Sequence, residues 1–169
     1  MTTRQFLVLL LSGFLTVTAW ADAPSIVLRD LDGRTRNVNE FVGHGKWTVV
    51  VAWAHDCRIC DREMREMTAF HNAHHQKDAS VLGITLDGAA QLPQARAFVK
   101  RHKLPFVNLV AEPTQEVMRQ FGAGEFVGTP TYYIYTPKGK IVGQNIGPVT
   151  RKELEKFIAS DHKDSPHEK

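Results

Sequence analysis

The sequence lacks three features that would assign it at once to a class. Its apolar run near the N-terminus, residues 6–17, is shorter than the about 20 residues that a membrane-spanning helix needs. It has no cluster of basic residues, because 21 Lys and Arg are scattered among 18 Asp and Glu, for a net charge of +3. It has no internal repeat or long low-complexity segment. We therefore expect an ordinary solvated surface, with no nucleic-acid partner.

The N-terminus has the pattern of a signal peptide. Arg4 precedes the apolar run, and Ala-Trp-Ala at 19–21 supplies small residues at both positions of an A-x-A cleavage site. We expect residues 1–21 to be removed, residues 22–160 to form one domain, and residues 161–169 to be a flexible charged tail. A retained membrane anchor is the alternative. A signal peptide together with a cysteine pair indicates an oxidising compartment, which for a bacterial signal is the periplasm.

Apolar β-branched runs alternate with helical patterns along the rest of the chain. Strands are predicted at residues 26–28, 35–38, 47–52, 80–86, 107–111, 131–135 and 140–142. Helices are predicted after Cys60, from Pro93, from Pro113 and from Thr150, where Glu153 completes a capping box. The run at 47–52 has no polar alternation after Thr48, as expected of a central strand buried on both faces. This order predicts an α/β domain with a mixed central sheet flanked by helices.

The only two cysteines, Cys57 and Cys60, stand where the run at 47–52 passes into a helical pattern. Residues three apart in a helical turn have Cβ atoms roughly 5–6 Å apart, so the two thiols can close a disulfide. Cys57 at the helix N-terminus would have its thiolate favoured by free N–H groups and the helix dipole. We expect Cys57 to attack and Cys60 to resolve the mixed disulfide. A purely structural disulfide is the alternative, although so short a loop gains little stabilising entropy.

Histidines suggest a rival function. His71 and His75 have i, i+4 spacing, but no acidic or cysteine residue accompanies them at a set spacing, so a solvated polar face is expected. His55 with Cys57 and Cys60 is a soft ligand set that suits Cu(I) or Zn(II). A copper carrier is therefore the alternative to thiol–disulfide exchange.

The stretch W-A-H-D-C-R-I-C at 53–60 resembles the W-A-x-W-C-x-x-C of the thioredoxin superfamily, and within it the TlpA/ResA-like periplasmic thiol–disulfide oxidoreductases. Glu63 falls where this subgroup carries a glutamate, and G-T-P-T at 128–131 looks like its cis-proline loop. Similarity extends to the lead-in segments 31–34 and 41–43 and to a strand–helix insertion at 92–121. The resemblance implies a thioredoxin-like fold with an N-terminal extension and a central insertion.

The resemblance also implies roles. Pro130 would follow a cis peptide bond, and Thr129 would offer its backbone to an extended substrate strand, with Trp53 beneath the site as a second substrate-binding residue. Glu63, on the side of Cys60, would relay a proton during resolution; an exposed helical carboxylate in an ion pair is the other interpretation. The implied protein is a monomer without cofactor or metal that reduces protein disulfides and takes electrons from a membrane thiol transporter.

Three positions depart from the usual residues of the superfamily, and a fourth bears on a rival function, thiol peroxidase. Asp56 replaces the usual tryptophan before the first cysteine, and Ile59 replaces the usual proline before the second. Val51 stands where cytoplasmic thioredoxins bury an aspartate. Ala54 stands where thiol peroxidases carry a threonine, so a peroxide site is not supported.

Overall fold

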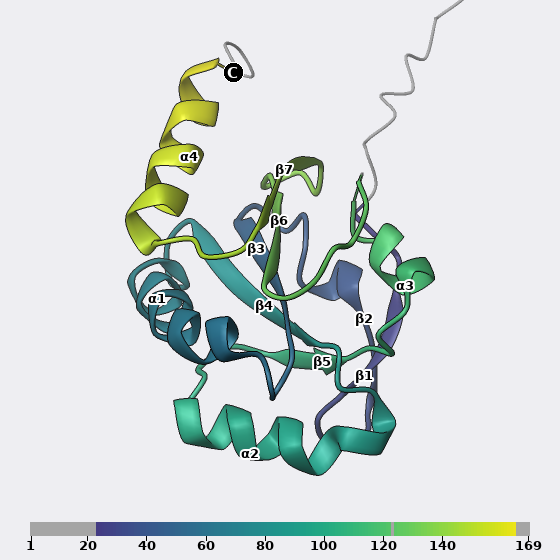
Figure 1. Cartoon of the computed structure of the whole chain (residues 1–169). Coiled ribbons are helices and arrows are strands. Elements are labelled where there is room, and N and C mark those ends of the chain that lie inside the picture. The colour runs from purple at the N-terminus through teal and green to yellow at the C-terminus, as the bar shows by residue number, and fades with distance from the viewer. Residues whose placement is uncertain (1–22, 123, 165–169) are drawn as a thin grey trace, which may run out of the picture.

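The computed structural model describes residues 23–122 and 124–164, so the predicted signal peptide lies outside the described residues. Figure 1 shows one twisted sheet with helices packed around it. The strands are β1 (Val27–Asp30), β2 (Thr35–Asn37), β3 (Trp47–Trp53), β4 (Ala79–Thr85), β5 (Asn108–Val110), β6 (Thr131–Tyr135) and β7 (Ile141–Ile146). The helices are α1 (Arg58–His74), α2 (Leu92–His102), α3 (Gln115–Arg119) and α4 (Arg151–Asp164), with short 3₁₀ helices η1 (Val38–Glu40) and η2 (Ala89–Gln91).

The sheet is mixed, as predicted. Its strand order is β2-β1-β5-β4-β3-β6-β7. The three central strands β3, β4 and β5 are parallel, and the strands on both sides of them pair antiparallel. Parallel neighbours bring their carboxyl ends to the same edge of the sheet, and α/β sheets place their sites there. The ends of β3 and β4 therefore decide where the functional groups of this chain meet.

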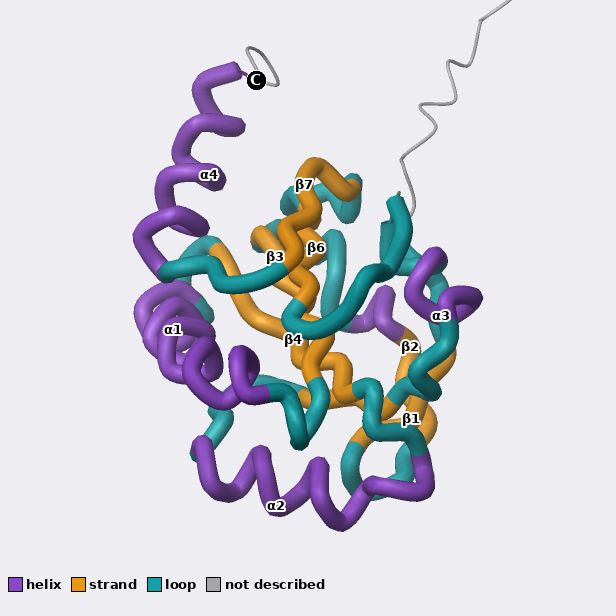
Figure 2. The backbone as a smooth tube through the Cα atoms, viewed as in Figure 1, coloured by secondary structure: helices purple, strands orange, loops and turns teal. Residues whose placement is uncertain are grey.

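Strand β3 is buried along its whole length and contributes to a core on each face of the sheet. Val49, Val51 and Trp53 pack with buried residues of α1, α2 and α4. Val50 and Ala52 pack with the other core, which α3 covers. Figure 2 shows α1 and α4 together on one side of the strands and α3 on the opposite side. The alternation follows from the two-residue period of a strand, and burial on both faces explains why the run has no polar residue after Thr48.

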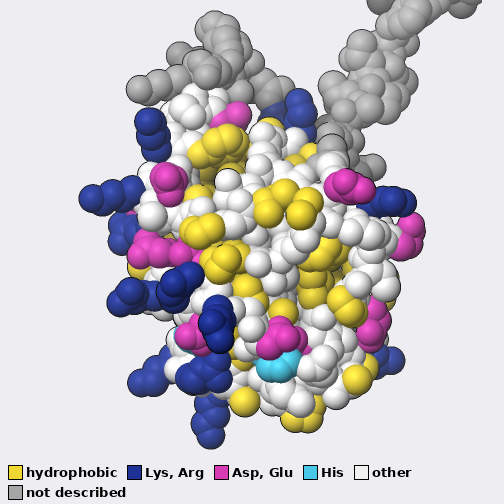
Figure 3. Space-filling view, viewed as in Figure 1, with side chains coloured by type: hydrophobic (Ala, Val, Ile, Leu, Met, Phe, Trp, Pro, Cys, Tyr) yellow, Lys and Arg dark blue, Asp and Glu magenta, His cyan; other side chains and the backbone are white. Residues whose placement is uncertain are grey.

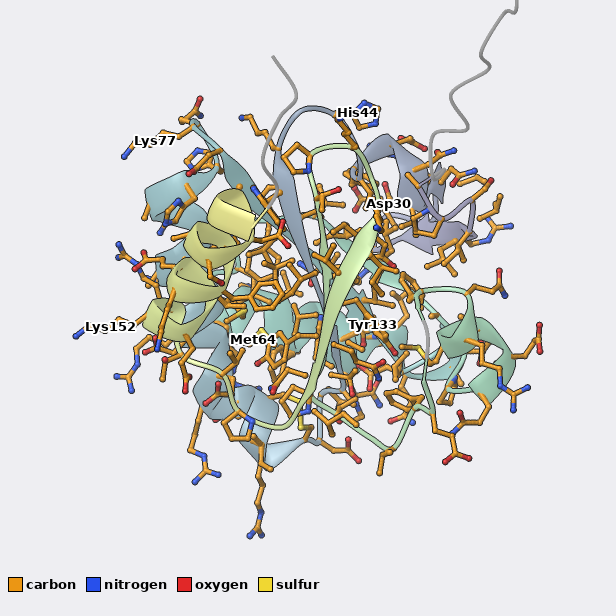
Figure 4. All side chains as sticks on the ribbon, turned by 90° about the horizontal axis from the view of Figure 1, so that it is seen from above. Asp30, His44, Met64, Lys77, Tyr133 and Lys152 are labelled. Atoms are coloured by element: carbon orange, nitrogen blue, oxygen red, sulfur yellow. A yellow bond between two sulfur atoms is a disulfide. The ribbon has the colours of Figure 1, made fainter. Side chains whose placement is uncertain are left out.

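Helix α1 shows the same division between interior and solvent. Met64 of α1 lies in the interior beside α4 (Figure 4). Lys77, which follows α1, and Lys152 of α4 lie at the margin of the molecule. The apolar residues Met64, Met67 and Phe70 recur at helical spacing, so a single face of α1 is buried against the sheet. Among the described residues, no helix is long and apolar enough to cross a membrane.

Several boundaries differ from the predictions, including those of α3, β7 and α4. Helix α3 ends at Arg119, before Phe121, because the chain turns towards Gly122 and Gly124. Strand β7 runs on to Ile146, because its whole length pairs with β6. Helix α4 continues to Asp164, so the first part of the tail predicted from residue 161 is helical. Backbone hydrogen bonds propagate a helix one residue at a time, without a need for apolar side chains in its last turn.

Candidate active site

A tight turn joins β3 to α1 and carries the first cysteine. The Cys57 N–H donates to the Ala54 carbonyl oxygen at 3.2 Å and closes the turn. Cys57 is the N-cap of α1, and its Sγ accepts a hydrogen bond from the Cys60 N–H at 3.1 Å. Negative charge that develops on this sulfur is therefore met by a free backbone N–H and by the positive end of the helix dipole.

Cys57 and Cys60 form a disulfide with a Cα–Cα distance of 5.2 Å. Cys60 is completely buried in the core beneath α1, whereas Cys57 is partly exposed. An incoming sulfur can therefore reach Cys57 but not Cys60. This is the asymmetry that the sequence predicts from the position of each thiol in the helix.

The loop before β6 lies directly against the disulfide. The Thr129–Pro130 peptide bond is cis, as the resemblance implied. The Thr129 carbonyl oxygen is 3.4 Å from the Cys57 Sγ. Thr131 Oγ1 donates to the Gly128 carbonyl oxygen at 2.5 Å and holds the loop from its far side. Residues more than 70 positions apart thus meet at one point, and the backbone carbonyl of Thr129 lies beside the accessible sulfur.

Trp53 is not at the surface, so the prediction that it binds substrate is wrong. Its side chain is completely buried, and its ring stacks on Phe98 with centroids 4.4 Å apart. Its Nε1–H donates to Asn108 Oδ1 at 3.0 Å. The last residue of β3 supports the turn from below, because a ring of this size fills the space between the sheet and α2.

Glu63, a residue of α1, lies close to β6 and to the segment that leads into α4. Its Oε2 accepts a hydrogen bond from the Val149 N–H at 2.9 Å, and the residue is only partly exposed. Glu63 has no ion-pair partner among the described residues, so it is not an exposed carboxylate in an ion pair. The hydroxyl of Tyr132 is buried with no hydrogen-bond partner among the described residues. Burial and the nearby Glu63 carboxylate both raise the pKa of Tyr132. Glu63 therefore lies close to the strand that follows Pro130.

A second polar pair adjoins the turn, and the sequence did not predict it. Asp87 follows the end of β4, and its side chain is only 2% exposed. His55 Nδ1 lies 2.7 Å from Asp87 Oδ1, and the His55 backbone N–H donates to the same oxygen at 3.1 Å. Thr85 Oγ1 donates to Asp87 Oδ2 at 2.5 Å. Histidine and acidic surfaces adjoin over the β3–α1 turn on the face shown in Figure 3.

The arrangement of His55 does not favour a copper carrier. Within residues 23–122 and 124–164, ligand atoms of His55, Asp56 and Asp87 lie within 4.8 Å of one another. His55 forms no such group with Cys57 and Cys60 in this part of the chain. Three hydrogen-bond donors already satisfy the Asp87 carboxylate, so the cluster is explained as a hydrogen-bonded pair.

His71 and His75 belong to the packing of α1 and do not form a polar face. Their rings stack with centroids 4.8 Å apart, and His71 also contacts the ring of Phe106. His71 Nδ1 accepts a hydrogen bond from the Val81 N–H at 3.2 Å, which fixes a neutral ring with Nδ1 unprotonated. Burial, and secondarily the neighbouring His75, lower the pKa of His71 to about 4.

This depressed pKa predicts a loss of stability in mild acid. Between pH 6.5 and about 4, the unfolded chain binds a proton at His71 that the folded protein does not bind. The free energy of unfolding should therefore fall as the pH decreases through this range. After a discount for partial exposure, we expect His71 to account for about 1–2 kcal/mol of the fall. Urea unfolding of the wild type and of His71→Asn, which keeps an acceptor for Val81, would measure it at pH 7 and pH 4.5.

The difference between the two proteins isolates His71, because every other titrating group is common to both. His71→Asn should lose less stability than the wild type on going to pH 4.5. Equal losses in the two proteins would contradict the assignment of a neutral, buried His71.

Residues 20–144 match the AhpC/TSA family. The chain is 26% identical over 137 residues to thiol-disulfide oxidoreductase ResA of Bacillus thuringiensis, across 81% of this chain and 75% of that protein. It is 26% identical over 114 residues to sporulation thiol-disulfide oxidoreductase A of Bacillus subtilis, across 67% of each chain.

A solved structure has the same fold. It is a thiol:disulfide interchange protein of the thioredoxin family from Chlorobium tepidum, with a TM-score of 0.68 and 22% identity, covering 82% of this chain and 94% of that one. This likeness confirms the predicted thioredoxin-like fold, with its mixed sheet flanked by helices.

Proposed function

Because the chain belongs to the AhpC/TSA family, we propose that it is a thiol–disulfide oxidoreductase whose Cys57–Cys60 pair exchanges with disulfides of partner proteins. One observation carries the proposal: a partly exposed Cys57, bonded to a buried Cys60, lies 3.4 Å from the Thr129 carbonyl of a cis-proline loop. The relatives named above are thiol–disulfide oxidoreductases, which supports the same activity here. Ala54 at the position of the peroxidase threonine argues against peroxide reduction.

In the reduced protein, the Cys57 thiolate attacks one sulfur of a partner disulfide, and the other partner sulfur leaves with the bonding electrons. The Cys60 thiol then loses its proton and attacks the Cys57 sulfur, which releases the partner sulfur that Cys57 had bound and restores the Cys57–Cys60 disulfide. Glu63 takes the proton from Cys60, because it lies one helical turn away and its Oε1 accepts no hydrogen bond from the described residues. Thr129 offers its backbone to the partner strand.

The protein works in the periplasm as a reductase, and a membrane thiol transporter supplies its electrons. The reduction potential of the Cys57–Cys60 couple tests this direction, by titration with glutathione and trapping of the thiols. A potential near the ~−270 mV of thioredoxin is expected of a reductase. A potential near the ~−120 mV of DsbA would instead make the protein an oxidant.

Substitution of Cys57 tests the exchange itself. Cys57→Ser should reduce the rate of exchange with a model protein disulfide to the uncatalysed background, because Cys60 is buried and cannot substitute for it. The rate would be followed by alkylating free thiols at timed intervals. Exchange by Cys57→Ser at a rate close to that of the wild type would show that Cys57 is not the attacking group.

A further inference from the structure

His55 is fixed on the active-site turn by the carboxylate of Asp87, which lies just after the end of β4. Asp87 receives the ring Nδ1–H and the backbone N–H of His55, while Thr85 occupies the other carboxylate oxygen. A carboxylate that is 2% exposed must be paired, and these donors pair it. The hydrogen bond to Asp87 also assigns the ring proton to Nδ1, so Nε2 is the nitrogen that remains available.

The ring is both immobilised and reachable. The His55 side chain is 23% exposed, and its Nε2 has no hydrogen-bond partner among the described residues. The neighbouring side chains on the turn do not offer the same chemistry. Asp56 is an exposed carboxylate close to His55 and Asp87, and Arg58 is an exposed, permanently charged guanidinium. His55 is therefore the anchored acid–base group on this turn, two residues before Cys57.

Resting on the function proposed above, we propose that His55 donates a proton from Nε2 to the departing sulfur of the partner disulfide, and that Asp87 is the residue that positions it. Such a carboxylate–imidazole pair holds the ring in one tautomer and stabilises its protonated form during the reaction. Both residues follow the ends of adjacent parallel strands, β3 and β4, which is why they meet beside the cysteines.

The proton balance of the step is complete. The Nε2 proton comes from the solvent before the partner arrives. The Cys57 thiolate then bonds to one partner sulfur, the partner S–S bond breaks, and its electron pair leaves on the second sulfur. That sulfur receives the Nε2 proton and departs as a thiol, which leaves His55 neutral. In the reverse of this step, Nε2 removes the proton from the free partner thiol as its sulfur attacks the partner sulfur of the mixed disulfide, and the Cys57 thiolate leaves.

The test compares two disulfide substrates that differ in their leaving sulfur. An aliphatic disulfide, such as oxidised glutathione, releases a thiolate that gains from protonation. Ellman's reagent releases an aromatic thiolate that is stable without a proton, and such sulfurs leave readily. For reduced His55→Gln, we expect the rate with oxidised glutathione to fall by about tenfold or more, and the rate with Ellman's reagent to change less than twofold. Proton transfer speeds both directions, so the equilibrium constant with glutathione should stay within twofold of the wild-type value.

Asp87→Asn should show the same selective loss, and the double variant should be no slower than His55→Gln, because the two residues act as one unit. His44→Gln is the matched control: His44 is an exposed histidine in the loop before β3, at the opposite end of the strand from the cysteines. It should leave both rates unchanged. Circular dichroism would check that the variants fold. If Asp87→Asn, which alters a buried residue, does not fold, the comparison of His55→Gln with the wild type is enough to test the proposal.

Equal slowing of His55→Gln with both substrates would mean that His55 only places Cys57, and the proposal would be wrong. Unchanged rates with both substrates would also overturn it, as would an equilibrium constant shifted tenfold with no selective loss of rate. These outcomes are distinct from failure of the proposed function, in which the wild type itself would exchange with neither substrate in a Cys57-dependent way.

Discussion

Cys60→Ser is expected to form mixed disulfides with partner proteins and to retain them. Cys57 remains partly exposed at the start of α1, so the first attack proceeds as in the wild type. In the wild type, Cys60 makes the second attack. The Cα atoms of Cys57 and Cys60 are 5.2 Å apart, inside the range in which disulfides close without movement of the backbone. A serine hydroxyl cannot attack a disulfide sulfur. Release then depends on thiols from solution, and we expect it to slow by at least about a hundredfold.

Non-reducing electrophoresis after acid quenching would measure these adducts, with mass spectrometry to locate the linked cysteine. Cys57→Ser is the matched control. It retains one thiol at the same turn, but that thiol belongs to the completely buried Cys60, and it should accumulate no adduct. Adducts linked through Cys60 in the control, or rapid release by Cys60→Ser, would contradict the assigned order of attack.

Local patterns in the sequence predicted the elements of the fold well. The β-branched run at 47–52 became β3, and its lack of alternation matches a strand buried on both faces. The capping box at the start of α4 is present, because the Thr150 N–H donates to Glu153 Oε2 at 2.8 Å and the Glu153 N–H donates to Thr150 Oγ1 at 3.3 Å. These features depend on residues a few positions apart, and a periodic pattern or a short spacing contains the information needed to predict them.

The parts of the site that were not predicted depend on contacts between distant residues. His55 and Asp87 are 32 positions apart, and Asp87 stands before Gly88 in a pair that is typical of an ordinary turn. A usable signal did exist: Asp87 directly follows the strand predicted at residues 80–86, and polar residues at the carboxyl ends of neighbouring parallel strands converge. For Glu63 the sequence left two interpretations open, because its partner is the backbone N–H of Val149, and no side-chain pattern reports a backbone donor.

Trp53 shows how a motif can identify a residue and still misplace its role. The resemblance correctly put it beneath the active site, but its burial is set by the path of α2, from which Phe98 covers the ring. Asn108, 55 positions further along the chain, then supplies the acceptor for the indole N–H. Contact with substrate is therefore excluded by packing, and the effect of Trp53 on the site is indirect.

Gly83→Ala is expected to destabilise the protein by about 2–4 kcal/mol, because the side chains of Asn108 and Trp53 leave no room for a methyl group at Gly83. A Cβ at Gly83 would lie 1.9 Å from Asn108 Oδ1 and 3.1 Å from Trp53 Nε1. Asn108 would have to move, although its Nδ2 is also bonded to the Phe106 carbonyl oxygen at 2.9 Å. The buried indole N–H would then lose its acceptor, and the cost of that loss adds to the steric strain.

A double-variant cycle in urea would separate the two causes. Asn108→Ala removes the side chain that the new methyl group strikes, so Gly83→Ala should cost at least about 1 kcal/mol less in the Asn108→Ala background than in the wild type. Gly128→Ala is the control for a glycine without neighbours, since a Cβ there meets no atom within 4 Å. It should change the free energy of unfolding by less than about 0.5 kcal/mol. Additive costs at Gly83 and Asn108 would mean that the cost of the methyl group arises within β4 and not from its contact with Asn108. The Trp53–Asn108 hydrogen bond would then not be the reason why Gly83 cannot be replaced.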